Sequence, residues 1–122
     1  MEGSSMNIFG VENGYWVETS GTALMGTVKT DYATLVEKFG EPTYTNGDKT
    51  TAEWCLEFEC DADNGSLGED GNVEYVTATI YDWKTFDTPM GEYDWHIGGF
   101  SEEAVDAVMS AFETANLSLS TY

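Results

Sequence analysis

Two short segments carry the residue types that general acid–base chemistry uses. They are Tyr81-Asp82-Trp83-Lys84 and Asp94-Trp95-His96. Asp82 or Asp94 could orient His96 as a general base, and Tyr81 or Lys84 could complete such a site. The chain has no Gly-x-Ser-x-Gly, no His-x-x-x-His and no cysteine–histidine motif, and no third partner stands at a recognisable spacing. We therefore predict no catalytic residues and a protein that is not an enzyme.

The same two segments are rich in aromatic residues, which can pack the core or stack on a base. The candidate ligand pocket consists of Tyr81, Trp83, Lys84, Trp95 and His96. Because the chain has no arginine, ligand phosphates would depend on Lys84, on backbone amides or on a helix N-terminus. A protein that binds a nucleotide signal is therefore one of two functions that we keep open.

Carboxylates are concentrated in and after residues 50–63. Ala52, Trp54, Leu56, Phe58 and Cys60 alternate there with Glu53, Cys55, Glu57 and Glu59. This alternation is typical of a half-buried strand with one face in the core. Eight carboxylates fall within 22 residues that contain no basic residue: Glu53, Glu57, Glu59, Asp61, Asp63, Glu69, Asp70 and Glu74.

This acidic set has two interpretations. Outward residues on a strand lie about 6.6 Å apart, close to twice the spacing of about 3.4 Å between base pairs along a DNA strand. The set could therefore mimic a phosphate backbone and occupy the basic groove of a nucleic-acid-binding protein. Alternatively, it is a solvated strand face that prevents edge-to-edge aggregation.

The overall charge limits the choice of partner. The chain has 23 acidic residues against four lysines, and its formal net charge is -19. Direct binding of nucleic acid is not expected, because its affinity comes largely from Lys and Arg. Mimicry of a polyanion, adaptation to high salt and plain solubility remain as explanations of the charge.

The sequence gives no clear sign of a metal, a cofactor or a membrane. Residues 61–72 resemble a calcium loop in composition, but Gly65, Ser66 and Asn72 stand where the EF-hand needs Asp or Asn, Gly and Glu. No apolar run has the length of a membrane span, and the N-terminus lacks the regions of a signal peptide. Cys55 and Cys60 should lie on opposite faces of one strand, unpaired and reduced. We expect no metal, no cofactor and an intracellular protein.

The elements around these sites are predicted from periodicity and turn residues. Strands are expected at residues 15–18, 22–28, 50–63, 73–83 and 93–97, and residues 116–122 either fray or add a strand. One helix follows an N-cap at Thr30, with Asp31 in its first turn, and ends at Gly40. A second helix follows Ser101, and its apolar stripe is Ala104, Val105, Val108, Met109, Phe112 and Ala115.

These elements predict an α+β fold, an antiparallel sheet of about four strands with two helices packed on one face. Residues 1–21 are expected to be a partly ordered N-terminal segment. Residues 22–122 are expected to form a single α+β domain.

Four segments carry a resemblance to known proteins: FGEPTY (39–44), AEW (52–54), ATIYDWK (78–84) and WHIGG (95–99). Here the chain resembles small uncharacterised accessory proteins of tailed phages. The resemblance implies counter-defence, including the anti-CRISPR class, in the cytoplasm of an infected bacterial host. The first helix, the FGEP turn and the Trp54 strand also resemble a unit of β-lactamase-inhibitor-like and outer-membrane-assembly lipoprotein domains, which favours a binding module. We thus predict a phage-type inhibitor of a host nucleic-acid-binding or defence protein, acting through the acidic set.

Overall fold

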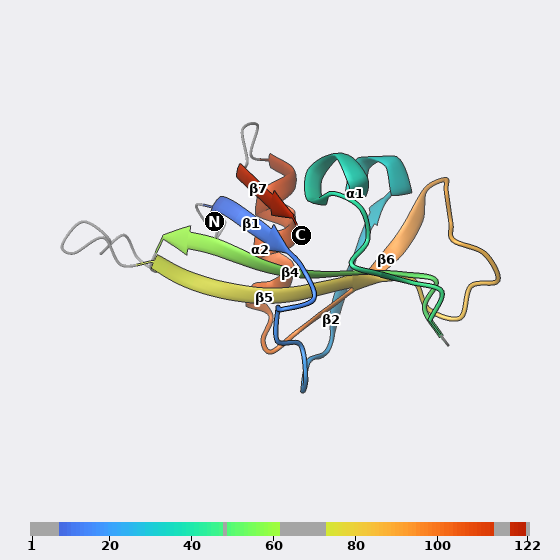
Figure 1. The fold of residues 1–122 in the computed structure, drawn as a ribbon, viewed down its shortest axis with the longest axis horizontal. Helices are drawn as coiled ribbons and strands as arrows, with labels where there is room; N and C mark the ends of the chain where they lie inside the picture. The colour runs from blue at the N-terminus through green and yellow to red at the C-terminus, as the bar shows by residue number, and fades with distance from the viewer. Residues whose placement is uncertain (1–7, 48, 62–72, 114–117, 122) are drawn as a thin grey trace.

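A single β-sheet forms the centre of the computed structural model, which describes residues 8–47, 49–61, 73–113 and 118–121 (Figure 1). Its strands are β1 (Ile8–Asn13), β2 (Ala23–Thr30), β3 (Tyr44–Thr45), β4 (Ala52–Asp61), β5 (Val73–Tyr81), β6 (Tyr93–Gly99) and β7 (Ser118–Thr121). Their order is β2-β6-β5-β4-β1-β7, and β3 pairs with β4 outside this path. All of these pairs are antiparallel except β1 and β7, which run parallel.

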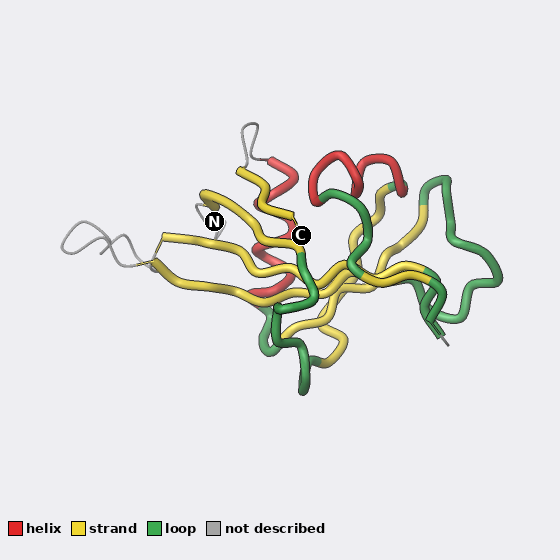
Figure 2. Tube along the Cα trace, in the orientation of Figure 1, coloured by secondary structure: helices red, strands yellow, loops and turns green. Residues whose placement is uncertain are grey.

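The predicted fold class is confirmed, but the expected number of strands is too small. The fold is α+β, with a largely antiparallel sheet and, among the described residues, two helices and six strands that follow one another across the sheet instead of about four. β1 and β7 account for the difference, and Figure 2 shows them side by side above the long hairpin of β4 and β5. Ser118–Thr121 is a strand, which is one of the two outcomes that the sequence allows for residues 116–122.

The first strand lies earlier in the chain than its sequence pattern predicts. Residues 15–18 form turns, and the strand is Ile8–Asn13. The register of β1 on β4 shifts between Ile8 and Gly10, so that burial along the strand does not alternate regularly. A bulge of this kind hides the period-two pattern by which a strand is recognised.

The first helix, α1 (Tyr32–Phe39), is bounded by residues that satisfy its free backbone groups. Asp31, not Thr30, is the N-cap, and its carboxylate accepts a hydrogen bond of 2.8 Å from the Thr34 N–H. Thr30 is instead the last residue of β2. At the other end Gly40 has φ of 83°, a conformation that glycine adopts without strain, and its N–H donates to the Val36 carbonyl.

The second helix, α2 (Glu103–Glu113), packs on the same face of the sheet as α1. The Phe39 ring of α1 lies 5.9 Å from Phe58 of β4 and 5.8 Å from Phe112 of α2. Ser101 accepts a hydrogen bond from the Glu103 N–H, as a capping residue does. The predicted apolar stripe is only partly right, because Met109 is 41% exposed. The buried α2 residues are Ala104, Ala107, Val108, Ser110 and Ala111.

The hydrophobic core lies between the sheet and the two helices. Trp54, Leu56 and Phe58 of β4 are fully buried, and Ile80 of β5 and Ile97 of β6 lie beside them on the same face. This confirms the predicted inward positions of the central strand. The opposite face of the sheet, called the outer face below, carries Glu53, Cys55, Glu57 and Glu59 of β4, because successive side chains point to opposite sides.

Candidate functional site

Three half-buried carboxylates lie next to one another on the outer face. Glu57 of β4 pairs with Glu12 of β1 in the antiparallel register, and Glu59 stands two residues further along β4. Directly opposed residues in neighbouring strands point to the same side of the sheet, with Cβ atoms about 5 Å apart. Glu12, Glu57 and Glu59 therefore form one cluster, called the acidic face below.

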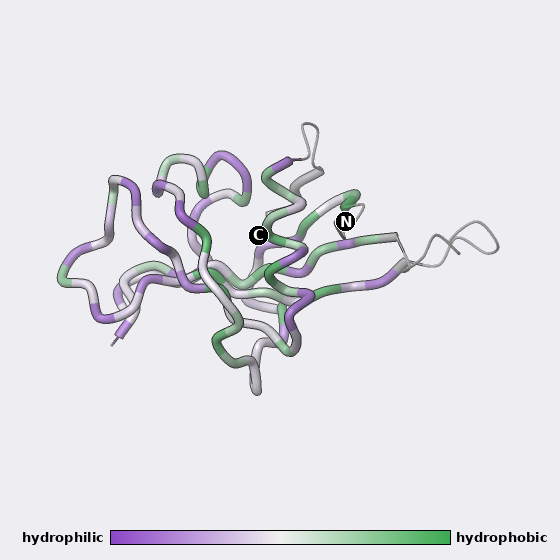
Figure 3. The backbone as a smooth tube through the Cα atoms, turned by 180° about the vertical axis from the view of Figure 1, so that it is seen from behind, coloured by the Kyte–Doolittle hydropathy of each residue, from purple (hydrophilic) through white to green (hydrophobic). Residues whose placement is uncertain are grey.

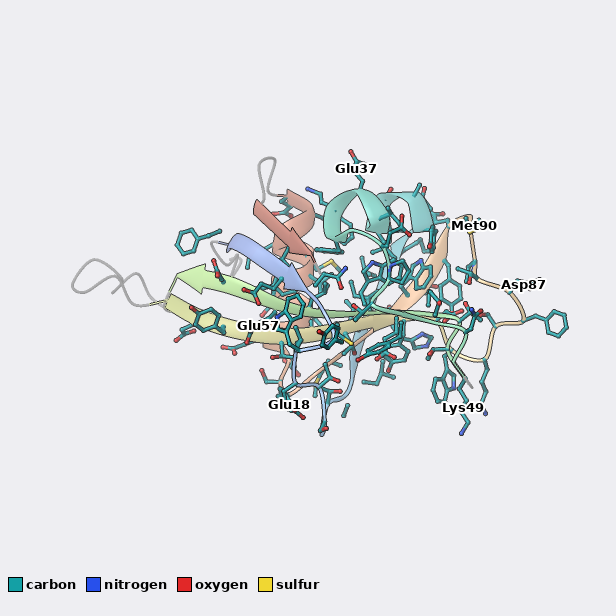
Figure 4. All side chains as sticks on the ribbon, viewed as in Figure 1. Glu18, Glu37, Lys49, Glu57, Asp87 and Met90 are labelled. Atoms are coloured by element: carbon teal, nitrogen blue, oxygen red, sulfur yellow. The ribbon has the colours of Figure 1, made fainter. Side chains whose placement is uncertain are left out.

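The carboxylates of the acidic face repel one another. Burial, together with the negative charges of Glu12 and Glu59, raises the pKa of Glu57 above its usual value. Among the residues that the structure describes, no lysine forms an ion pair with any of the three. Figure 4 shows Glu57 near the middle of β4 and Lys49 beyond one end of this strand. The acidic face therefore carries uncompensated negative charge.

The structure separates several members of the predicted acidic set. Glu74 pairs with Cys60, which is part of the core, so Glu74 belongs to the helix-bearing side and not to the outer face. Asp61 is the last residue of β4. The remaining members, Asp63, Glu69 and Asp70, lie outside the described residues.

Glu12 is a member of the acidic face that sequence reasoning missed. Its neighbourhood with Glu57 depends on the pairing of β1 with β4, two strands far apart in the chain. Its carboxylate also accepts a hydrogen bond of 2.9 Å from Trp16 Nε1, in the turn that follows β1. The same turn also contributes Val17, whose side chain is buried. Cys55 of β4 is buried as well, and it lies between Glu53 and the acidic face along the strand. No local signal in the sequence links Glu12 to the central strand.

A cavity of about 310 Å³ opens on the outer face at the other end of β4. It is lined by Thr22, Ala23, Leu24, Thr50, Glu53, Thr79, Tyr81, Trp83 and Gly98. Two residues of the predicted ligand pocket, Tyr81 and Trp83, therefore line a real cavity. His96 stacks on the Tyr81 ring at 5.4 Å with an angle of 17° between the planes.

Trp95 is not part of this cavity. It is fully buried on the helix side, where its ring contacts Trp54 at 5.5 Å and Tyr93 at 5.2 Å. Trp95 and His96 are adjacent in a strand, so they must point to opposite faces of the sheet. The prediction that Trp95 shares a pocket with Tyr81 and Trp83 is thus wrong.

Lys84 and Lys49 both lie against Trp83 at the rim of the cavity. The Nζ atom of each lysine is 5.8 Å from the centroid of the Trp83 ring, within the range of a cation–π contact. The Lys84 N–H donates to the Lys49 carbonyl at 2.7 Å, which joins the two segments. Lys84 was predicted to hold a ligand phosphate, and in the structure its ammonium lies over an aromatic ring.

The carboxylates considered as partners of His96 are engaged elsewhere. Asp82 is fully buried and accepts hydrogen bonds from the backbone of Thr51 and Ala52 and from the hydroxyls of Thr51 and Thr85. Asp94 lies 4.0 Å from Lys29 Nζ in an exposed ion pair. The Nδ1 atom of His96 is buried without a hydrogen-bond partner. Neither Asp82 nor Asp94 thus pairs with His96, and the absence of catalysis stays a prediction.

The described part of the chain offers no obvious metal site or membrane span. Within it, no group of three or more His, Cys, Asp or Glu side chains is placed to hold a metal ion. The loop considered for calcium, residues 61–72, falls almost entirely outside the described residues. None of the helices that the structure describes is long and apolar enough to cross a membrane.

Comparison of the chain with protein-family models, with curated proteins and with solved structures finds no match. The resemblance to tailed-phage accessory proteins therefore stays a prediction. The outer face thus carries two candidate binding features, the acidic face and the cavity.

Proposed function

We propose that this protein is a binding module that captures a basic partner through its acidic face, in the manner of a DNA mimic. The partner would be a protein with a nucleic-acid-binding groove, such as a host nuclease or defence protein that a phage inhibitor must block. The observation that carries the proposal is the clustering of Glu12, Glu57 and Glu59 without a neighbouring ion-pair partner in the described chain.

The carboxylates are spaced so that they could take the place of phosphates in the basic groove of a partner protein. Glu57 and Glu59 are separated by about 6.6 Å along β4, and Glu12 lies about 4.8 Å away in the neighbouring strand. Lys and Arg side chains of a DNA-binding groove are spaced to neutralise successive phosphates. A rigid sheet would present its charges in a fixed array, so little conformational entropy would be lost on binding.

The energetics of the free protein also support this proposal. Burial and, after it, the negative charges of Glu12 and Glu59 raise the pKa of Glu57, so the charged form of this side chain carries a cost in the folded chain. Cations from a partner would relieve the repulsion and would speed up encounter at low salt. Binding should therefore weaken with ionic strength, and also as the pH falls toward the raised pKa of Glu57, where the carboxylate becomes protonated.

The test compares two triple variants that each remove three negative charges. The acidic-face variant carries Glu12→Gln, Glu57→Gln and Glu59→Gln. The control variant carries Glu37→Gln, Asp87→Asn and Glu113→Gln, at exposed positions on α1, in the connection after β5 and on α2. Tagged wild-type and variant proteins are used to capture partners from bacterial lysate at low and at high salt, and mass spectrometry identifies the retained proteins.

We expect the wild type to retain a basic nucleic-acid-binding protein at low salt, to lose it at high salt and to release it when duplex DNA is added. The acidic-face variant should retain that partner about tenfold less, whereas the control variant should retain it like the wild type. Equal losses in both variants would show that only net charge matters. Undiminished capture by the acidic-face variant would show that the partner binds elsewhere. Either result contradicts the proposal.

A small-molecule role is the second candidate, because Tyr81 and Trp83 line a cavity of about 310 Å³. A nucleotide as the ligand stays a prediction. Its phosphates would have to avoid the Glu53 carboxylate, which also lines the cavity.

A further inference from the structure

The cavity on the outer face combines aromatic walls with one acidic side chain. Glu53, Tyr81 and His96 follow one another across β4, β5 and β6 in the sheet register, and Trp83 comes from the segment after β5. Gly98 lies in the cavity wall, where a Cβ atom would come within 2.5 Å of Thr79 Oγ1. Any larger residue at position 98 would crowd this part of the cavity, so the glycine keeps it open.

Among the described residues Glu53 is the one carboxylate that lines the cavity, and these residues leave its charge poorly compensated. It is half-buried, and burial raises the pKa of its carboxyl above the usual value. No hydrogen-bond donor or ammonium group among the described residues contacts it. A half-buried carboxylate without a partner is costly, and a cation brought by a ligand would remove that cost.

The aromatic walls favour the same kind of ligand. The faces of Tyr and Trp rings attract cations, and sites for organic ammonium groups are commonly built from such rings together with a carboxylate. In this protein the Trp83 ring already attracts ammonium groups, since Lys49 Nζ and Lys84 Nζ each lie 5.8 Å from its centroid. Neither lysine forms an ion pair with Glu53 in the described chain, so the carboxylate itself remains open to a ligand.

We propose that this cavity is a binding site for a small organic ammonium compound, whose charged nitrogen pairs with Glu53 and whose apolar body packs against Tyr81 and Trp83. The site is separate from the acidic face, because Cys55 and the turn after β1 lie between Glu53 and Glu57. The proposal goes beyond the capture of a protein and does not depend on it. The cavity volume of about 310 Å³ is at the lower end of the range for small-molecule sites.

Three probes of nearly equal size test the ligand class in this full-length protein. They are 2-phenylethylamine, the uncharged 2-phenylethanol and the anionic 3-phenylpropionate. Each is titrated into 15N-labelled protein, and the amide shifts of Glu53, Thr79, Tyr81 and Gly98 report binding at the cavity. We expect the amine to bind at least about tenfold more tightly than the alcohol, and the anion to bind most weakly of the three.

The high negative charge of the chain attracts any cation, so the test needs a matched pair of variants. Glu53→Gln removes the carboxylate of the cavity, and Glu59→Gln removes one charge from the acidic face. Glu53→Gln should weaken amine binding about tenfold, whereas Glu59→Gln should change it less than twofold. Trp83→Ala, at a 44% exposed position, should also weaken it while the spectrum remains that of a folded protein.

Several results would overturn this proposal. If Glu53→Gln and Glu59→Gln weaken the amine equally, the attraction comes from net charge alone. If 2-phenylethanol binds as tightly as the amine, the cavity recognises only an apolar body. If 3-phenylpropionate binds more tightly than the amine, Lys49 and Lys84 define the site and the ligand is an anion. None of these results decides the role of the acidic face, which is tested with a triple variant and by the capture of a protein partner.

Discussion

The carboxylate of Asp82 should be one of the largest single polar contributions to stability in this protein. It is fully buried just after β5 and accepts hydrogen bonds from the Thr51 N–H at 2.7 Å, the Ala52 N–H at 3.2 Å and the Thr51 hydroxyl at 2.6 Å. The Thr85 hydroxyl donates a fourth. These bonds fasten the start of β4 to the segment that carries Trp83, so Asp82 also supports one wall of the cavity.

The substitution Asp82→Asn keeps the size of the side chain and removes its charge. One oxygen remains for the two backbone N–H groups, but an amide NH2 group then faces two hydroxyls that donated to the carboxylate. Hydrogen bonds to a charged acceptor contribute about 1.5–3 kcal/mol, and neutral ones about 0.5–1.5 kcal/mol. The Thr51 hydroxyl can turn toward Thr88 Oγ1, 2.5 Å away, which relieves part of the loss. We therefore expect a loss of about 2–4 kcal/mol in the free energy of unfolding.

The assay is urea unfolding followed by circular dichroism, with Asp87→Asn as the control. Asp87 is an exposed residue of the same connection, so the control changes the net charge equally without removing a buried interaction. Figure 3 shows hydrophilic and hydrophobic stretches alternating along this connection, which also carries the exposed side chains of Phe86 and Met90. A stability of Asp82→Asn within about 0.5 kcal/mol of the control would refute the reasoning, because surface changes have effects of that size.

The pH dependence gives an independent check on the same residue. Burial alone would raise the pKa of Asp82, but the hydrogen bonds from Thr51, Thr85 and Ala52 outweigh it, and the pKa lies below its usual value. A carboxyl with a lowered folded-state pKa stabilises the fold above the unfolded pKa, and this contribution is lost as the pH falls toward the folded value. The stability difference between wild type and Asp82→Asn should thus be constant near neutral pH and shrink below about pH 4.

Three further predictions test other parts of the structure. Glu57→Gln should stabilise the protein by about 0.5 kcal/mol in urea unfolding at neutral pH, because burial and the charges of Glu12 and Glu59, which raise the pKa of Glu57, disfavour its charged form. This gain should vanish as the pH falls through the raised pKa, and a loss of stability would contradict this explanation. Gly99→Ala should lower the free energy of unfolding by at least about 2 kcal/mol, and with it the thermal midpoint, because the new Cβ would lie 2.3 Å from Ala104 Cβ. An unchanged midpoint would show that α2 shifts freely. In a Cys60→Ala background the Cys55 thiol should react with a disulfide reagent at pH 8 about a hundredfold more slowly than a free cysteine. The reason is that burial and the negative charge of Glu53 raise the pKa of Cys55 to about 11. A normal rate would mean that the thiol is exposed.

The local pattern of the chain was enough to predict most of the elements. The alternation from Ala52 to Cys60 identified β4 and its buried face, because a strand places every second residue on the same side. The residues around 30–42 marked both ends of α1, with an error of one position at the N-cap. Such signals depend only on residues that are close in the sequence, and these residues stay close in space whatever the tertiary fold.

The composition of the functional surfaces was decided by the tertiary structure. Glu12 joins the acidic face only because β1 pairs with β4, and a bulge concealed β1 from the sequence pattern. Glu53 was predicted to belong with Glu57 and Glu59, yet it lines a cavity with Tyr81 and Trp83. Alternation tells which residues share a face of one strand, but not which strands lie beside it or what covers each end of that face. Those contacts join residues distant in sequence, so they become defined only when the whole sheet is assembled.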